Sequence, residues 1–395
     1  MCDYVCPLDA KTIEKARVEL NEDPLQRNGQ IQALKDWIHE QKWISIPTDN
    51  FFLAGILRGT KFSQLLAREL IIYIAHTPSK RPLWPRARNP VSPEFRKCMA
   101  VGHNIILPKK DAEGQTIIIA RPALQSNGTL IEDDIDKSNI LNDFFVSQTV
   151  LNDQDLDIPA LPPFSLGRPL NNIVITDDEF KVKDSIPFVG VIDTSGEPYS
   201  ADSLYQVTAA MANKLSMDES VQVNGVVVIV DFTGLSMKHV SFGFHIYKEA
   251  LREAKKYGHK VPIDMDPHRL KGVHCYNNDK ILETLHDIAM KMDIVKERVT
   301  MIKKLEKKVV FHGRSLETIY DYIDKSLLPD EYLPDDYNGP SAGPIKQIVD
   351  DFIESMSAPD VLDWFNRFHS VTGVDLSKKP RDDEPQASFR KLSTS

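Results

Sequence analysis

The chain has 395 residues, 42% of them hydrophobic and 27% charged, with a formal net charge of −9 at pH 7. The length allows about two or three domains with a sizeable core. The acidic balance excludes global attraction to nucleic acid, so any affinity for anions has to come from a local basic patch. The four cysteines are scattered, and the sequence shows no apolar leader, which predicts a cytoplasmic protein. No run reaches about 20 apolar residues, so we expect any membrane contact to be peripheral.

The first part of the chain predicts an all-helical domain at residues 10–80. Apolar residues recur at helical spacing in 12–20, 28–42 and 61–76. Asp49 is placed to cap a further helix that begins directly after it. A proline-rich loop then closes this domain.

A second domain is predicted at residues 96–340, and it begins with a hairpin. Two apolar runs, 104–107 and 116–120, flank a polar turn of the kind that joins antiparallel strands. Residues 132–157 then hold eight acidic residues against one lysine, and a proline-rich run follows. This composition predicts a surface insertion near residues 150–200.

The most apolar stretch is Val226–Val230, an unbroken β-branched run between Gly225 and Asp231. Because it lacks alternation, it predicts a strand buried on both faces, at the centre of a parallel or mixed sheet. The periodicity further downstream predicts a helix at 241–257, a strand at 270–276, an amphipathic helix at 279–306, a strand at 309–311, a helix from Ser315 to Tyr322 and a last helix from Ile345 to Phe368. We expect the compact part to end at Pro340, with a C-terminal helix and a disordered tail in residues 341–395.

No catalytic motif occurs in the sequence. It contains no nucleophile elbow, no phosphate-binding P-loop, no dinucleotide-binding fingerprint and no C-x-x-C pair. The segment Asp231–Gly234 imitates the D-x-x-G of nucleotide hydrolases, but no phosphate-cradling loop accompanies it. The histidines are dispersed at spacings that dictate no metal site. The sequence therefore predicts neither an enzyme nor a cofactor or metal.

Two features point to binding instead. The helix predicted at 279–306 carries a wide apolar stripe with three methionines, which adapt to irregular apolar partners. It either packs permanently on the sheet or swings away to admit a lipid. Between residues 296 and 314 seven basic residues face two acidic ones, and Arg269 and Lys271 flank Leu270 on a strand, so that both point to the same face. These cations are either an ordinary solvated surface or a patch that grips a phosphoinositide headgroup.

Several segments carry a resemblance to a known family. They are LRGTKF at 57–62, NGVVVIVDFTG at 224–234, RLKGVHCYN at 269–277, FHGRSLETI at 311–319 and LLPDEY at 327–332. In their order and spacing these segments resemble the CRAL-TRIO lipid-binding family. The resemblance implies an α/β lipid cage, a mixed and largely parallel sheet covered by helices and a mobile gate helix, with an N-terminal all-helical domain.

The resemblance also implies site residues. The ligand-binding positions would be Tyr205, Thr208, Val226, Val228, Val230, Leu235, Leu270, Val273, Ile281, Leu285, Ile288 and Met292. The phosphoinositide-binding positions would be Arg269, Lys271, Lys304 and Lys308. Thr60 stands where the family usually has a basic residue, so one arm of that anion site is missing unless Arg58 or Lys61 replaces it.

The function implied by the resemblance is non-enzymatic. The protein would bind a tocopherol-, retinoid- or phosphatidylinositol-like lipid and transfer it between membranes, with a phosphoinositide-containing surface as its docking partner. The alternative is a regulatory interaction module, in which the acidic insertion binds a protein partner and the lipid cage is vestigial.

Overall fold

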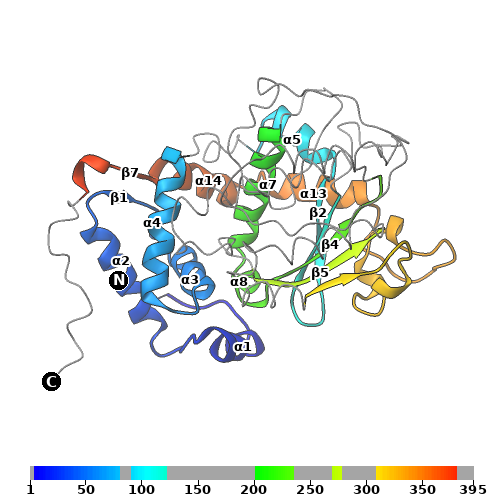
Figure 1. Ribbon diagram of the computed structural model, residues 1–395, viewed down its shortest axis with the longest axis horizontal. Coiled ribbons are helices and arrows are strands. Elements are labelled where there is room, and N and C mark those ends of the chain that lie inside the picture. Colours follow the sequence, from blue (N-terminus) through cyan, green and yellow to red (C-terminus); the bar gives the residue numbers. More distant parts are fainter. Residues whose placement is uncertain (1–3, 81–89, 122–200, 235–268, 278–307, 380–395) are drawn as a thin grey trace, which may run out of the picture.

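The computed structural model describes residues 4–80, 90–121, 201–234, 269–277 and 308–379 (Figure 1). The acidic insertion near 150–200 and the helices predicted at 241–257 and 279–306 lie outside these residues. No helix in the described ranges is long and apolar enough to cross a membrane.

The N-terminal part is helical, as predicted. It comprises α1 (Ala10–Leu20), α2 (Arg27–Glu40), α3 (Asn50–Gly59) and α4 (Gln64–Lys80). Their inward stripes form one hydrophobic cluster, in which Leu34 and Leu57 are fully buried. Asp49 takes the N-cap position of α3 but makes no side-chain capping bond there. It accepts instead from Arg367 Nη1 at 2.8 Å, far away in the sequence.

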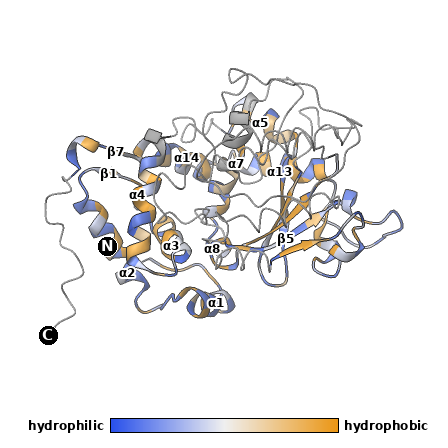
Figure 2. Ribbon diagram, in the orientation of Figure 1, coloured by the Kyte–Doolittle hydropathy of each residue, from blue (hydrophilic) through white to orange (hydrophobic). Residues whose placement is uncertain are grey.

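The central sheet has five strands in the order β2-β3-β4-β5-β6. Their bounds are β2 (Asn104–Lys110), β3 (Thr116–Ala120), β4 (Val226–Asp231), β5 (Leu270–Tyr276) and β6 (Val309–Phe311). The hairpin β2–β3 is antiparallel and the other neighbours are parallel. β4 lies in the middle with all six residues buried, which confirms the prediction from its unbroken β-branched run. In Figure 2 the colour of these strands marks most of their residues as hydrophobic.

The helices α5 (Pro93–Ala100), α7 (Ala201–Ser216) and α8 (Glu219–Asn224) lie beside the sheet. Gly225 joins α8 to β4 with φ of +81°, and a Cβ at this position would overlap the carbonyl oxygen of Arg269. Only glycine therefore allows this backbone to approach β5, where Val226 N donates to Arg269 O at 2.9 Å.

The C-terminal segment corrects two predictions of helices. The helix expected from Ser315 to Tyr322 is a short 3-10 turn, Glu317–Ile319. The single last helix is two helices, α13 (Ile345–Ser355) and α14 (Pro359–Val371), because proline fits the first turn of a helix but not its interior. Further 3-10 turns lie at Lys325–Leu327, Asp330–Tyr332 and Leu376–Lys378.

The compact part also continues beyond Pro340. Both C-terminal helices contribute to the core that surrounds the central sheet. After α14, the two-residue strand β7 (Gly373–Val374) pairs antiparallel with β1 (Ile44–Ser45) in the N-terminal part. The C-terminal segment therefore touches both the sheet and the N-terminal helices (Figure 1).

Candidate functional site

One face of the central sheet collects five of the residues predicted to line a ligand cage. Alternation along β4 places Val226, Val228 and Val230 on the same side. In the parallel register, Leu270 lies opposite Val226 and Val273 lies opposite Val228. The register shifts by one residue between these two pairs, and this irregularity allows Leu270 and Val273, three positions apart, to lie opposite valines of the same face. We call this set of five the valine face.

The neighbouring strands extend the valine face with further apolar side chains. Ile118 lies opposite Val228 on β3, and Val309 lies opposite Val273 on β6. The three valines of β4 are buried, whereas Leu270 and Val273 are half-buried. The apolar surface therefore becomes more exposed from β4 towards β5.

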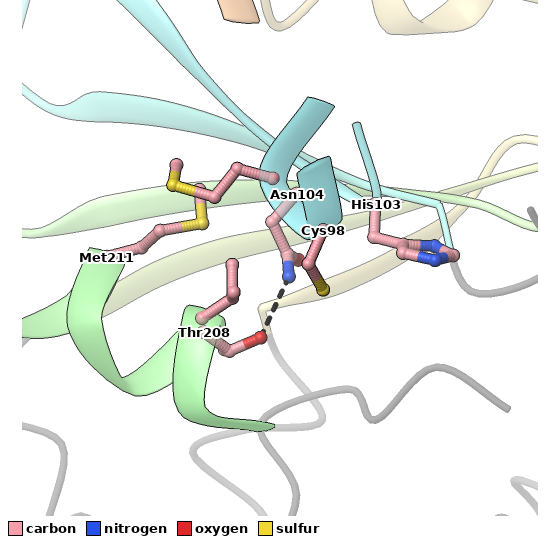
Figure 3. Close-up of a pocket in the computed structure, with 7 residues that line it drawn as sticks. Cys98, His103, Asn104, Thr208 and Met211 are labelled. Atoms are coloured by element: carbon pink, nitrogen blue, oxygen red, sulfur yellow. Dashed lines mark hydrogen bonds between the residues drawn. The ribbon is translucent and has the colours of Figure 1, made fainter. Parts of the chain in front are cut away.

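A small pocket lies where α7 passes the start of β2 (Figure 3). Asn104 Nδ2 donates to Thr208 Oγ1 at 3.2 Å, and Asn104 lies opposite Ala120 in the sheet. The pocket is lined by Cys98, Met99, His103, Asn104, Val207, Thr208 and Met211. Its volume of about 10 Å³ is at the lower limit for one water molecule, so this pocket does not hold a lipid.

The other predicted ligand residues remain predictions. Tyr205 lies on α7, one turn before Thr208. The residues Leu235, Ile281, Leu285, Ile288 and Met292 lie outside the described ranges.

The predicted cations gather at the beginning of β5. Arg269 Nη2 and Lys271 Nζ both donate to Glu19 Oε2 on α1, at 2.7 and 2.9 Å, so their side chains do project to one side. Arg269 Nη1 also donates to Val223 O at 2.7 Å, and Lys308 Nζ donates to Leu270 O at 2.6 Å. Arg269, Lys271 and Lys308 are called the basic cluster below. The fourth predicted cation, Lys304, lies outside the described residues.

Glu19, which accepts hydrogen bonds from two residues of the basic cluster, is a residue that the sequence did not reveal. Burial raises its pKa, but the hydrogen bonds from Lys271 and Arg269 outweigh that effect and lower the pKa to about 2. Burial lowers the pKa of Lys271, although the hydrogen bond to Glu19 opposes the shift. No spacing signal connects Glu19 with β5, because the contact spans 250 residues.

Arg58 does not replace the basic residue missing at Thr60. It is fully buried, and its Nε and Nη1 donate to Glu22 Oε2 and Glu219 Oε2 at 2.9 and 2.6 Å. Burial lowers the pKa of Arg58, but the hydrogen bonds and charges of these carboxylates more than compensate and raise it. Thr60 itself donates to the Ile56 carbonyl at 2.9 Å, as a threonine at a helix end commonly does.

The Asp231 carboxylate, at the end of β4, has a structural role. Asp231 Oδ1 accepts from Thr233 N at 2.9 Å and Oδ2 accepts from Tyr332 Oη at 2.5 Å, so this buried carboxylate fastens the end of β4. These bonds account for the D-x-x-G segment without a nucleotide.

A buried histidine pair lies on the sheet face opposite the valine face. His274 Nδ1 and His312 Nε2 share a hydrogen bond of 2.9 Å, and His312 Nδ1 is 2.7 Å from Thr318 Oγ1. Burial and the neighbouring His312 lower the pKa of His274 to about 4. Sequence spacing could not reveal the pair, because the two histidines are 38 positions apart. In the described parts of the chain, no group of three or more histidine, cysteine or acidic side chains could hold a metal ion.

Comparison with known proteins gives one family match and several relatives. Residues 188–332 match the model of the CRAL/TRIO domain, a range that holds α7 and strands β4 to β6. The alpha-tocopherol transfer protein-like proteins of Homo sapiens and Mus musculus are 25% and 24% identical over 332 residues, which are 83% of this chain and 71% of each relative. Clavesin-1 of Xenopus laevis is 22% identical over 329 residues, which are 82% of this chain and 73% of that protein.

Proposed function

Residues 188–332 of this chain match the CRAL/TRIO domain, and from this premise we propose that the protein binds a small hydrophobic ligand against the valine face and carries it between membranes. The ligand class is a tocopherol-, retinoid- or phosphatidylinositol-like lipid. The names of the alpha-tocopherol transfer protein-like relatives support this class. The protein acts by binding and release, with no chemical step.

The observation that supports the proposal best is the composition of the valine face. Its five residues come from the neighbouring parallel strands β4 and β5, and all five side chains are apolar. Hydrocarbon burial yields about 25 cal/mol per Å², so roughly 300 Å² of ligand surface would contribute about 7 kcal/mol. That magnitude approaches the roughly 8 kcal/mol of a micromolar complex, so no catalytic or covalent group is required.

Exchange of the ligand requires contact with a membrane. We propose that the basic cluster, together with Lys304, binds phosphoinositide headgroups and brings a cytoplasmic protein transiently to the bilayer surface. Each cation near an anionic surface contributes about 1 kcal/mol, so three or four of them suffice for reversible, peripheral association.

Extraction of the purified protein with organic solvent, followed by mass spectrometry, tests the carrier function. We expect one dominant apolar lipid at close to equimolar amount. Recovery of no lipid, together with no binding of tocopherol, a retinoid or phosphatidylinositol added to the protein, would contradict the proposal.

A further inference from the structure

The carboxylate of Glu19 lies where an anionic headgroup would have to bind. We propose that Glu19 is a built-in competitor, which keeps the basic cluster closed until an anionic ligand displaces it. This inference rests on the phosphoinositide-binding part of the proposed function and adds its regulation.

The geometry supports competition for one position. A single oxygen, Glu19 Oε2, accepts hydrogen bonds from Arg269 Nη2 at 2.7 Å and from Lys271 Nζ at 2.9 Å. A phosphate oxygen that accepts from both cations has to occupy the same place, because two anionic oxygens cannot share it. The bond from Arg269 Nη1 to the Val223 carbonyl holds the guanidinium in this orientation. The cluster is therefore already arranged as an anion site, and the protein's own carboxylate fills it.

The displacement is energetically feasible because the three side chains are partly exposed. Arg269, Lys271 and Glu19 expose 21%, 20% and 35% of their side chains. Water therefore reaches all three groups and can solvate the carboxylate when another anion takes its place. A phosphate monoester carries about −1.5 to −2 charges at neutral pH and has three acceptor oxygens, so it outcompetes a single carboxylate for two cations.

α1 can release Glu19 without leaving its place. Lys11 Nζ and Lys15 Nζ of the same helix donate to the carbonyls of Ala112 and Glu113 in the β2–β3 turn, at 3.2 and 3.1 Å. These bonds tie α1 to the sheet independently of Glu19. Rotation of the Glu19 side chain therefore makes Arg269 and Lys271 accessible to another anion. The charge of the neighbouring Lys15 also contributes to the lowered pKa of Lys271.

The test compares full-length variants in sedimentation with phosphatidylcholine vesicles that contain phosphatidylinositol bisphosphate. Glu19→Gln removes the competitor. Glu14→Gln is the matched control, because Glu14 is exposed on the same helix and pairs with its neighbour Arg17 at 2.7 Å, and because this substitution changes the net charge equally. The double variant Glu19→Gln/Arg269→Gln removes the competitor together with one of the cations it covers.

We expect Glu19→Gln to bind about fivefold more tightly than the wild type and Glu14→Gln, which is the change expected if the competing carboxylate costs about 1 kcal/mol of headgroup binding. The double variant should lose this gain. Equal binding by Glu19→Gln and Glu14→Gln, or a gain that persists in the double variant, would overturn the inference. If Glu19→Gln fails to fold, Glu19→Asp replaces it, and its shorter carboxylate should give part of the same gain.

Two further outcomes separate the inference from the proposed function. Binding by the wild type without a gain in Glu19→Gln leaves the phosphoinositide site intact and removes only the competitor. Absence of binding in every variant overturns both, while lipid extraction still decides the carrier function. Soluble inositol trisphosphate distinguishes the source of the anion: a gain with it assigns recognition to the phosphates themselves, whereas a gain with vesicles alone assigns it to the lipid.

Discussion

At the scale of single residues, the position of a charge decides its role. Arg58 and Arg269 are both arginines near acidic partners, but Arg58 is fully buried between Glu22 and Glu219, whereas Arg269 lies at a partly exposed strand end. A buried arginine that pairs with two carboxylates holds the fold together. A partly exposed one can exchange its partner.

The first prediction concerns this buried arginine. Arg58→Met leaves Glu219 buried without its cation and leaves Glu22 paired with Arg27 but not with Arg58, and breaking a buried pair typically costs about 3–5 kcal/mol. We expect a loss of that order in the free energy of unfolding, measured with urea. Arg17→Met is the control, since the pair of Arg17 with Glu14 is exposed and such pairs contribute about 0.3–0.5 kcal/mol. Equal losses in the two variants would show that the buried network does not stabilise the protein.

The second prediction separates the two faces of the sheet. Val273→Phe enlarges a half-buried side chain on the valine face, whereas Val310→Phe enlarges one that lies opposite His274 on the other face. We expect Val273→Phe to weaken binding of a fluorescent apolar ligand at least about tenfold, because overpacking costs roughly 1–3 kcal/mol. Val310→Phe should bind as the wild type does. A larger loss in Val310→Phe would place the ligand on the histidine face.

At the scale of elements, the strands were easier to predict than the C-terminal helices. β5 and β6 have the predicted bounds, because turn residues flank both short strands. Apolar spacing predicts a last helix that continues through Ser357–Pro359. Pro359 instead starts a new helix, α14. Apolar periodicity alone does not locate the break between two consecutive helices.

The third prediction concerns the histidine pair, which links β5 to the turn after β6. The pKa of His274 is lowered from 6.5 to about 4, so the unfolded chain binds more protons than the folded one between these values. Stability should therefore be complete above about pH 6.5 and fall as the pH drops towards 4. Burial also lowers the pKa of His312, although the charge of Asp321 opposes this shift. The ring of Tyr322 packs against both imidazoles.

The measurement is the free energy of unfolding across this pH range. We expect a loss of about 2 kcal/mol in the wild type, less than the full shift implies because solvent screens part of the imidazole environment. His274→Asn should flatten this dependence, whereas His39→Asn, at an exposed position on α2, should not. The same slope in His274→Asn and the wild type would exclude the pair as its source.

At the scale of the whole molecule, the C-terminal helices bind the two parts of the chain together. Trp364 of α14 is buried and packs edge-on against Phe51 of α3, with ring centroids 4.8 Å apart. Ile348 and Ile353 of α13 join the core beside the sheet. The N-terminal helices and the sheet therefore share a hydrophobic core with a segment that was predicted to lie beyond the compact part.

The fourth prediction tests this connection by truncation. Removal of residues 344–395 deletes both helices and β7, so we expect loss of cooperative thermal unfolding and exposure of hydrophobic surface to a reporter dye. Removal of residues 380–395 is the control and should leave the melting temperature unchanged. Cooperative unfolding at the wild-type temperature in the longer truncation would contradict the role of α13 and α14.

The sequence by itself determined the class of fold, the helical N-terminal part, the central position of β4 and the shared direction of Arg269 and Lys271. These features follow from local periodicity and from the alternation of side chains along a strand, which neighbouring residues control. The tertiary structure alone decided that Glu19 covers the two cations, that Glu22 and Glu219 enclose Arg58, and that His274 meets His312. These contacts join residues from 36 to 252 positions apart. No local pattern encodes such pairings, because chain folding rather than sequence spacing brings the partners together.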